Sequence, residues 1–248
     1  MIALPAGEAQ VWAVDLGSLP GDLGPLEASL SGAERDRASR FVFPDDRRRF
    51  IAAHAALREV LAAYLGRSPR DLAFATGPRG KLRLADAAEA WLQFNLSHSH
   101  EAALIVCARE RAVGADIEWM RADVDCAEIV ERFFSAEERR EWAGLPPAEQ
   151  REAFFRGWTC KEAYVKALGE GLSHPPEAYT VRLGPAHAAA LLADTRRPGT
   201  ASAWSLHTVP APAGYSAAVA VEGAEARMVL DRWKGPRPDF VSKNGRIR

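Results

Sequence analysis

The order of a helix-capping sequence, a long helix and a series of strands occurs twice along this chain, and this repetition limits the folds open to it. Ser31-Gly-Ala-Glu34 and Ser135-Ala-Glu-Glu138 both have the Ser-x-x-Glu spacing of a capping box, which opens a helix. In each half a phenylalanine follows the serine by 19 residues (50 − 31 and 154 − 135), and the long helix around it ends at Leu65-Gly66 or Leu168-Gly169. We therefore predict two copies of one α+β unit.

Strands are predicted at matching places in the two halves. The expected strands are Val11 to Asp15, Leu72 to Thr76, Leu92 to Leu96, Ala102 to Ala108, Ala112 to Glu118, Tyr179 to Leu183, a strand from Trp204 onward, and Ser216 to Val221. Pro44 is expected to separate a short helix from the first long helix, Arg47 to Leu65. The polar stretch Ser97 to His100 is expected to connect two strands.

The predicted fold is α+β, with two similar α/β subdomains related by a pseudo-two-fold axis and an active site in the cleft between them. The first subdomain is expected to span residues 1–118 and the second residues 119–232, followed by a basic tail, 233–248, without periodicity and therefore extended or disordered. Arg58 and Glu162 each follow the capping serine of their own half by 27 residues (58 − 31 and 162 − 135), so they are expected to be at equivalent positions. One half would then offer a cation where the other offers a carboxylate.

Composition narrows the class of protein. Of 248 residues, 48% are apolar and 26% are charged, which is typical of a soluble globular chain. A net charge of −1 argues against a nucleic-acid-binding protein, which usually has a basic domain. Three scattered cysteines without Cys-x-x-Cys spacing favour a reducing compartment. With no recognisable signal peptide and no apolar run long enough to cross a bilayer, a cytosolic protein is expected, and a fused pair of units favours a monomer.

Carboxylates and one lysine form the first candidate site. Asp116 and Glu118 alternate with Ile117 on a predicted strand, so both face one side of it. Glu162 and Lys166 are separated by four residues on the second long helix and share one side of that helix. Three oxygen ligands with room for water suit Mg²⁺. The alternative is a set of solvated acids at a strand end and a surface ion pair.

Further candidates could bind an anionic ligand. Asn95-Leu-Ser-His-Ser99 offers hydroxyl groups and an imidazole suited to a phosphate, or it is an ordinary hairpin. Gly77-Pro-Arg-Gly80-Lys81 could bring backbone close to a ligand. The arginines between Arg35 and Arg49 are interleaved with acids, so a solvated helix surface is the alternative to a phosphate clamp.

Taken together, these segments resemble the 4′-phosphopantetheinyl transferases, specifically the large single-chain class with a duplicated fold. The matching segments are Asn95-Leu-Ser97-His98-Ser99, Gly114-Ala-Asp116-Ile-Glu118, Arg132-Phe-Phe-Ser135-x-x-Glu138 and Trp158-Thr-x-Lys161-Glu162-Ala-x-x-Lys166-x-x-Gly169-x-Gly171-Leu172. The resemblance implies Mg²⁺-dependent transfer of the phosphopantetheine arm of coenzyme A (CoA) to a serine of an apo acyl or peptidyl carrier protein, with adenosine 3′,5′-bisphosphate as the other product.

The resemblance also implies roles for single residues. Asp116, Glu118 and Glu162 match the metal ligands, and Glu162 also matches the general base. Lys161 and Lys166 match lysines near the pyrophosphate, with Lys166 a candidate to protonate or neutralise the leaving group. These five residues are the implied catalytic and metal-binding set.

The residues implied to bind CoA are Arg37, Arg49, Gly80, Lys81, Ser97, His98 and Lys161. The serine and the histidine match contacts to phosphates, the Gly-Lys pair matches the loop at the adenine, and the two arginines match cations at the 3′-phosphate. Two departures stand out. Leu82 follows the Gly-Lys pair where the family often has proline, and Glu34 stands where some members have lysine.

A carrier protein must bring its serine to the same place. The segment from Cys126 to Leu145 could dock it through Phe133, Phe134, Trp142 and Leu145. Packing in the core of the second domain is the alternative for the two phenylalanines. A non-catalytic CoA- or nucleotide-binding module of the same fold is the alternative to the enzyme. RNA binding through the arginines and the basic tail has little support at this net charge.

Overall fold

The structure, a computed structural model, describes residues 1–184 and 187–235. Its α-helices are α1 (Gly24–Glu27), α2 (Gly32–Ala38), α3 (Pro44–Leu65), α4 (Cys126–Phe133), α5 (Ala136–Ala143) and α6 (Pro147–Leu168). Its strands are β1 (Glu8–Asp15), β2 (Phe74–Thr76), β3 (Leu82–Leu84), β4 (Leu92–Ser99), β5 (Ala102–Arg109), β6 (Val113–Trp119), β7 (Tyr179–Val181), β8 (Leu191–Asp194), β9 (Trp204–Thr208), β10 (Tyr215–Glu222) and β11 (Arg227–Arg232). The predicted mixed α+β class is confirmed. The predicted tail lies outside the described residues from 236 onward.

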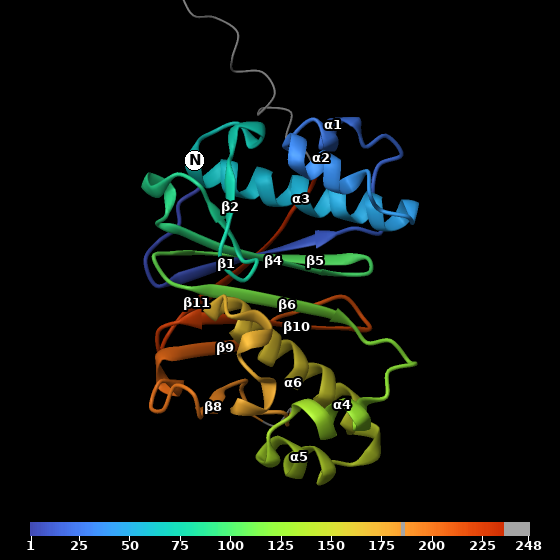
Figure 1. The fold of residues 1–248 in the computed structure, drawn as a ribbon, viewed down its shortest axis with the longest axis vertical. Coiled ribbons are helices and arrows are strands. Elements are labelled where there is room, and N and C mark those ends of the chain that lie inside the picture. The colour runs from blue at the N-terminus through green and yellow to red at the C-terminus, as the bar shows by residue number, and fades with distance from the viewer. Residues whose placement is uncertain (185–186, 236–248) are drawn as a thin grey trace, which may run out of the picture.

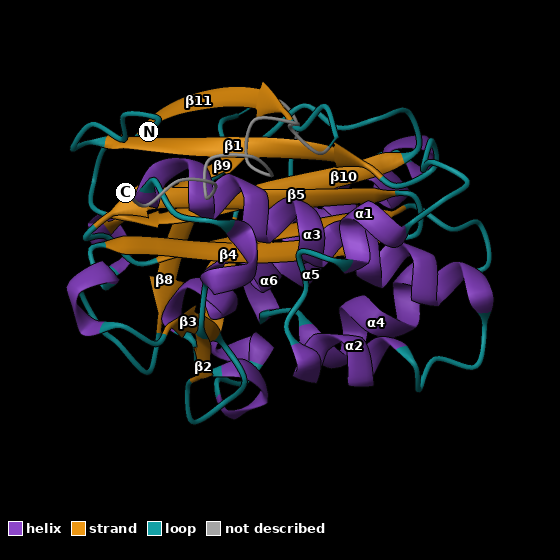
Figure 2. Ribbon diagram, turned by 90° about the horizontal axis from the view of Figure 1, so that it is seen from above, coloured by secondary structure: helices purple, strands orange, loops and turns teal. Residues whose placement is uncertain are grey.

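Two sheets form the middle of the molecule. One has the order β11-β1-β5-β4 and the other the order β6-β10-β9. Figure 1 shows the sheets one above the other, with α3 on the outer side of the first and α6 on the outer side of the second. Seen from above, β11 lies at the edge beyond β1 (Figure 2). Two small hairpins, β2–β3 and β7–β8, complete the strands of the described residues.

The two long helices share their boundaries. Each starts at a proline, Pro44 or Pro147, and each ends at a leucine followed by a left-handed glycine, Gly66 with φ 66° or Gly169 with φ 70°. Proline is tolerated in the first helical turn because its missing N–H would have no partner there. Pro44 therefore begins α3, which corrects the prediction that the helix starts at Arg47. Both predicted capping boxes, at Ser31 and Ser135, are confirmed.

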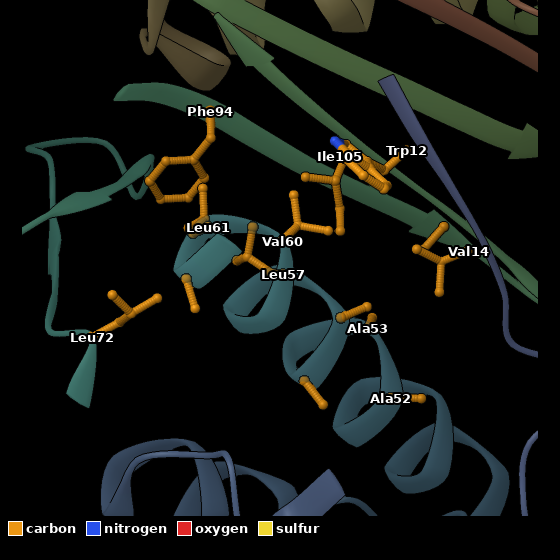
Figure 3. Packing of buried hydrophobic residues seen from close by; sticks show 14 of the residues in the cluster. Trp12, Val14, Ala52, Ala53, Leu57, Val60, Leu61, Leu72, Phe94 and Ile105 are labelled. Atoms are coloured by element: carbon orange, nitrogen blue, oxygen red, sulfur yellow. The ribbon is translucent and has the colours of Figure 1, made fainter. Parts of the chain in front are cut away.

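Side chains that alternate along the strands build three apolar layers. On β1, Trp12 and Val14 pack toward α3, whereas Val11 packs between the two sheets. Figure 3 shows Trp12 and Ile105 of the first sheet lying over Leu57 and Val60 of α3. A third layer packs α6 against the second sheet. The three cysteines are reduced and buried within these layers.

The strand pairings differ from the predicted division between residues 118 and 119. β6 pairs with β10, so it lies in the sheet of the second half, and β11 returns to pair with β1 of the first half. β1 pairs antiparallel with β5 as β6 does with β10, which places each of them first in its copy of the unit. The expected connection at Ser97 to His100 is also corrected, because β4 continues through Ser99. Among the described residues, no helix combines the length and the hydropathy needed to cross a membrane.

Candidate active site

Strand β6 turns two carboxylates toward the helix α6. Its odd-numbered side chains, Val113, Ala115 and Ile117, lie between the sheets, so Asp116 and Glu118 face the opposite way. Gly114 is the contact point between strand and helix: a Cβ there would lie 2.1 Å from the carbonyl oxygen of Ala163. Only a glycine at this position lets α6 approach β6 so closely.

Helix α6 brings a lysine to the buried aspartate. Lys166 Nζ lies 2.5 Å from Asp116 Oδ1 and 3.1 Å from Ser97 Oγ. Asp116 is 1% exposed, whereas the side chain of Lys166 is 31% exposed and so reaches the surface of the site. The sequence predicts that a carboxylate of this strand approaches the side of α6 that carries Glu162 and Lys166. The contact between Asp116 and Lys166 shows this approach.

The pKa values of all three acids are raised, in each case mainly by burial. Burial raises the pKa of Asp116, and Lys166 offsets part of this effect. Burial and the charge of Asp116 raise the pKa values of both Glu118 and Glu162, and the charge of Glu162 adds to the effect at Glu118. One lysine cannot neutralise three carboxylates, so the site is short of positive charge.

A divalent cation would supply that charge. Asp116 Oδ2 is buried and has no hydrogen-bond partner among the described residues, as expected of an oxygen that waits for a ligand. As the side chains stand, however, no cluster of three or more His, Cys, Asp or Glu residues in 1–184 and 187–235 is arranged to hold a metal ion. Lys166 occupies the side of Asp116 that faces α6. The donor set fits Mg²⁺, and the metal itself stays a prediction.

Polar side chains of β4 join the two halves beneath this site. The backbone N–H groups of Ala115 and Trp119 donate to Asn95 Oδ1 and Ser99 Oγ at 2.9 and 3.1 Å. Ile117 N–H donates to Ser97 Oγ at 3.4 Å in the same register. These side chains occupy the edge of β6 that faces away from β10. The sequence signal for this ladder is the alternation of Asn, Ser and Ser along an otherwise apolar strand.

Ser97 is therefore a structural link, and its contact to a CoA phosphate stays a prediction. Its hydroxyl donates to Asp116 Oδ1 at 3.0 Å and accepts from Lys166 Nζ and the N–H of Ile117. A hydroxyl has one donor and two acceptor positions, and all three are used. Ser99 has a similar place and donates to Glu118 Oε2 at 2.9 Å.

His98 faces the cations of the first half. Part of its surface is exposed, but the surrounding protein excludes enough water to lower its pKa. The positive charges of His54, Lys166 and Arg37 lower this pKa further. Arg37 is exposed and lies over the ring of Phe50, 5.1 Å from its centroid. Arg37 of α2 and Lys166 of α6 therefore bring positive charge close to His98, whose lowered pKa favours the neutral imidazole. An anion is the ligand that such a group attracts.

The other predicted CoA contacts lie on the surface of the first half or are engaged by groups of the protein. Arg49 pairs with Asp46 at 3.3 Å on the surface of α3. Gly80, with φ 92°, forms the exposed turn between β2 and β3. Lys81 Nζ donates to the carbonyl oxygens of Val113 and Ala167 at 2.8 and 2.9 Å. The hairpin therefore contacts the second half through the lysine.

Lys161 binds groups inside the second half, and its place at the pyrophosphate stays a prediction. It is 1% exposed, and its Nζ donates to both oxygens of Glu138 at 2.8 and 2.7 Å and to the carbonyl of Tyr179 at 2.6 Å. An ammonium group has three donors, and all are used inside the second half. Arg58 has a corresponding place in the first half, 1% exposed and bound to Glu34 Oε2 at 2.7 Å, so it offers no cation to the site.

The segment predicted to dock a carrier protein is largely packed. Phe134 is buried and stacks on Phe154 and Trp158, whereas Phe133 is half-buried at the edge of the same group. The indole N–H of Trp142 donates to the carbonyl of Gln150. Docking by this segment stays a prediction for its exposed faces.

Sequence comparisons agree with the geometry. The family model of the 4′-phosphopantetheinyl transferase superfamily matches residues 112–220, and that of the 4′-phosphopantetheinyl transferase N-terminal domain matches residues 23–111. The two matches meet where β6 begins the second copy of the unit.

The chain is 40% identical over 223 residues to 4′-phosphopantetheinyl transferase HetI of Nostoc sp., covering 90% of this chain and 91% of that protein. It is 31% identical over 155 residues to 4′-phosphopantetheinyl transferase Sfp of Bacillus subtilis, covering 62% of this chain and 66% of that protein. By its similarity to HetI over nearly its whole length, the chain belongs to the 4′-phosphopantetheinyl transferase superfamily of enzymes.

Proposed function

We propose that this enzyme transfers the 4′-phosphopantetheine group of CoA to a serine of an apo carrier protein, with Mg²⁺, and releases adenosine 3′,5′-bisphosphate. One observation carries the proposal. Where the two halves meet, Asp116 contacts Lys166 and burial raises its pKa, while burial and the charge of Asp116 raise the pKa values of Glu118 and Glu162. Acids whose pKa values are raised together at one place are typical of functional sites.

Asp116, Glu118 and Glu162 would hold the metal ion. When bound, Mg²⁺ neutralises charge on the diphosphate of CoA and orients it. Asp116 Oδ2, buried without a partner among the described residues, is the oxygen most in need of a cation. Ser97 and Ser99 donate hydrogen bonds to Asp116 and Glu118 and so fix the orientation of both carboxylates.

Two side chains of α6 would serve the chemistry. Glu162 accepts the proton of the carrier serine at a carboxylate oxygen, a role that its raised pKa favours because a stronger base takes the proton more readily. Lys166, partly exposed beside Asp116, donates to the phosphate oxygens of the leaving bisphosphate as negative charge builds on them.

The nucleotide end of CoA would lie on the first half. His98 and Arg37 are both exposed, and Arg37 and Lys166 bring positive charge close to the imidazole of His98. Arg49 on α3 and the backbone of Gly80 in the exposed turn between β2 and β3 suit the 3′-phosphate and the adenine. The side chains of Lys81, Ser97 and Lys161 are left out of this set because their donors are engaged within the protein. A monomer in the cytosol remains our expectation.

The direct test is the intact mass of an apo acyl or peptidyl carrier protein after incubation with this enzyme, CoA and Mg²⁺. The carrier should gain the mass of one phosphopantetheine group, and EDTA or Glu162→Gln should prevent the gain. Glu152→Gln, at an exposed position of the same helix, is the matched control and should transfer normally. CoA binding by calorimetry with no mass gain on a panel of carriers would favour the alternative, a module that binds CoA without turning it over.

A further inference from the structure

The hairpin of the first half reaches across to the backbone that carries the acids. β2 and β3 are joined by a tight turn in which Gly77 N–H donates to the carbonyl of Lys81. The side chain of Lys81 then leaves the hairpin and ends between two elements of the second half. Its Nζ donates to the carbonyl of Val113 at the start of β6, at 2.8 Å, and to the carbonyl of Ala167 in the last turn of α6, at 2.9 Å.

Both acceptors suit an ammonium group. The carbonyl of Ala167 belongs to the last turn of α6, where carbonyl groups lack helical partners and the helix dipole is negative. The side chain of Lys81 is half-buried at this junction, and burial lowers its pKa to about 8. A surface lysine that waits for a nucleotide would have neither property.

The turn after α6 is shaped to receive the hairpin. Gly169 is left-handed, and a Cβ there would lie 3.3 Å from Cδ of Lys81. Arg79 donates from Nη1 to the carbonyl of Glu170 at 3.3 Å. The Gly169-Glu170-Gly171 sequence thus stops the helix and also leaves room for the lysine and arginine of the other half.

The two carbonyls are next to the residues of the candidate site. Val113 precedes Gly114, where α6 touches β6, and lies three residues before Asp116 on the same strand. Ala167 directly follows Lys166. A single ammonium group therefore ties together the two backbones that carry the acids and the lysine.

We propose that Lys81 is a positioning residue, which holds α6 against β6 so that Glu162 and Lys166 face Asp116. The inference rests on the proposed function for its catalytic meaning and differs from a contact of this lysine to the adenine of CoA. Loss of the two hydrogen bonds would let the end of α6 move away from the strand. The site would then lose metal affinity and turnover, while the cations that attract the nucleotide stay in place.

Lys81→Met removes the ammonium and keeps much of the aliphatic side chain. Arg83→Met is the matched control, since Arg83 is exposed on the same hairpin. For each protein we would measure Mn²⁺ affinity by electron paramagnetic resonance without CoA, binding of adenosine 3′,5′-bisphosphate in EDTA, and kcat and KM for CoA. Lys81→Cys before and after alkylation with 2-bromoethylamine, which rebuilds a lysine-like side chain, tests rescue. The three natural cysteines are buried.

For Lys81→Met we expect Mn²⁺ affinity and kcat to fall by about 10- to 100-fold, the range seen when a group that orients metal ligands is removed. KM for CoA and bisphosphate affinity should match those of Arg83→Met, and aminoethylation of Lys81→Cys should restore kcat. Weaker bisphosphate binding with unchanged Mn²⁺ affinity would make Lys81 a nucleotide contact and overturn the proposal. So would a variant that behaves as wild type in every measurement.

Hydrogen exchange separates this proposal from the proposed function. If the wild-type enzyme binds no Mn²⁺ and labels no carrier, the proposed function fails. The effect of Lys81 on the stability of the end of α6 can still be measured. The amides in the last turn of α6 should exchange faster in Lys81→Met than in wild type or Arg83→Met. Equal exchange in all three proteins would show that Lys81 does not hold the helix.

Discussion

Arg58 and Lys161 occupy the same position in two successive copies of one structural unit. Each lies 14 residues after the proline that begins its helix (58 − 44 and 161 − 147). Each binds the glutamate of the capping box in its own half, Glu34 or Glu138. The lysine of the Lys161-Glu162 pair is therefore an internal support of the fold, and its neighbour Glu162 faces the site.

This relationship predicts that Lys161→Met unfolds more easily and leaves CoA binding unchanged. The substitution leaves the carboxylate of Glu138 buried without its cation, which typically costs about 3–5 kcal/mol of stability. Urea denaturation measures the loss. The double variant with Glu138→Gln should recover much of it, because no unpaired charge remains. If Lys161→Met has wild-type stability but binds CoA more weakly, Lys161 contacts the pyrophosphate and does not support the fold.

Acid sensitivity should come in part from Glu34. Burial alone would raise its pKa, but hydrogen bonds with His54 and Ser31 and the charge of Arg58 lower it to about 2 from an ordinary 4.5. The unfolded chain therefore takes up this proton first, so the contribution is complete above pH 4.5 and is lost as the pH falls from 4.5 toward 2.

Glu34→Gln should accordingly lower the free energy of unfolding at neutral pH by about 2–3 kcal/mol. Between pH 7 and pH 3 the variant should lose less stability than wild type does, because it lacks the group that protonates. Urea titrations at the two pH values test this. Equal losses in both proteins would show that Glu34 does not contribute to acid denaturation.

The contact between α6 and β6 should tolerate no side chain at residue 114. In Gly114→Ala the new Cβ would lie 2.1 Å from the carbonyl oxygen of Ala163 and 2.3 Å from the amide nitrogen of Ala167, so the helix must move. We expect a loss of at least about 1–3 kcal/mol, as for other overpacked interiors, and a larger loss of activity. Gly21→Ala, where a Cβ meets nothing within 4 Å, is the control. Unchanged stability and transfer in Gly114→Ala would contradict the packing described.

Several features could be predicted from the sequence because they depend on local spacing. The capping boxes, the glycines that end both long helices and the alternation of Asp116 and Glu118 are set by neighbours within a few residues. So is the shared helical face of Glu162 and Lys166. These predictions are confirmed.

The errors come from lengths and partners that local spacing does not reveal. The distance from the capping serine to the proline that begins the long helix is 13 residues in the first half and 12 in the second (44 − 31 and 147 − 135). Counting from the serines therefore matched Arg58 with Glu162, whereas the structure matches it with Lys161. The roles of Ser97 and Lys81 depend on β6, distant in sequence, and no periodicity within their own segments indicates such partners.

The asymmetry between the halves lies in the strands. Strand β1 has the same place in the first half as β6 has in the second. The side chains of Trp12 and Val14 on β1 face α3, whereas those of Asp116 and Glu118 on β6 face α6. The first half thus fills with apolar packing the place where the second half has acids.

Removing one acid should stabilise the metal-free protein. The pKa of Glu162 is raised by burial and by the charge of Asp116, so its carboxylate is held at a cost in stability. Glu162→Gln should raise the free energy of unfolding in EDTA by about 0.5–2 kcal/mol, the usual gain when a functional strain is relieved, while transfer is lost. Urea unfolding of this variant beside Glu152→Gln checks the sign. A destabilised Glu162→Gln would show that its charge is not opposed by Asp116.

The central claim is that acids from β6 and α6 share one divalent cation where the two halves meet. Titration of the purified enzyme with Mn²⁺, followed by electron paramagnetic resonance, tests it most directly. We predict one bound ion per chain in the wild type and in Glu152→Gln, and loss of that ion in Asp116→Asn and in Glu162→Gln. A wild type that binds no ion, or variants that bind it as the wild type does, would contradict the account.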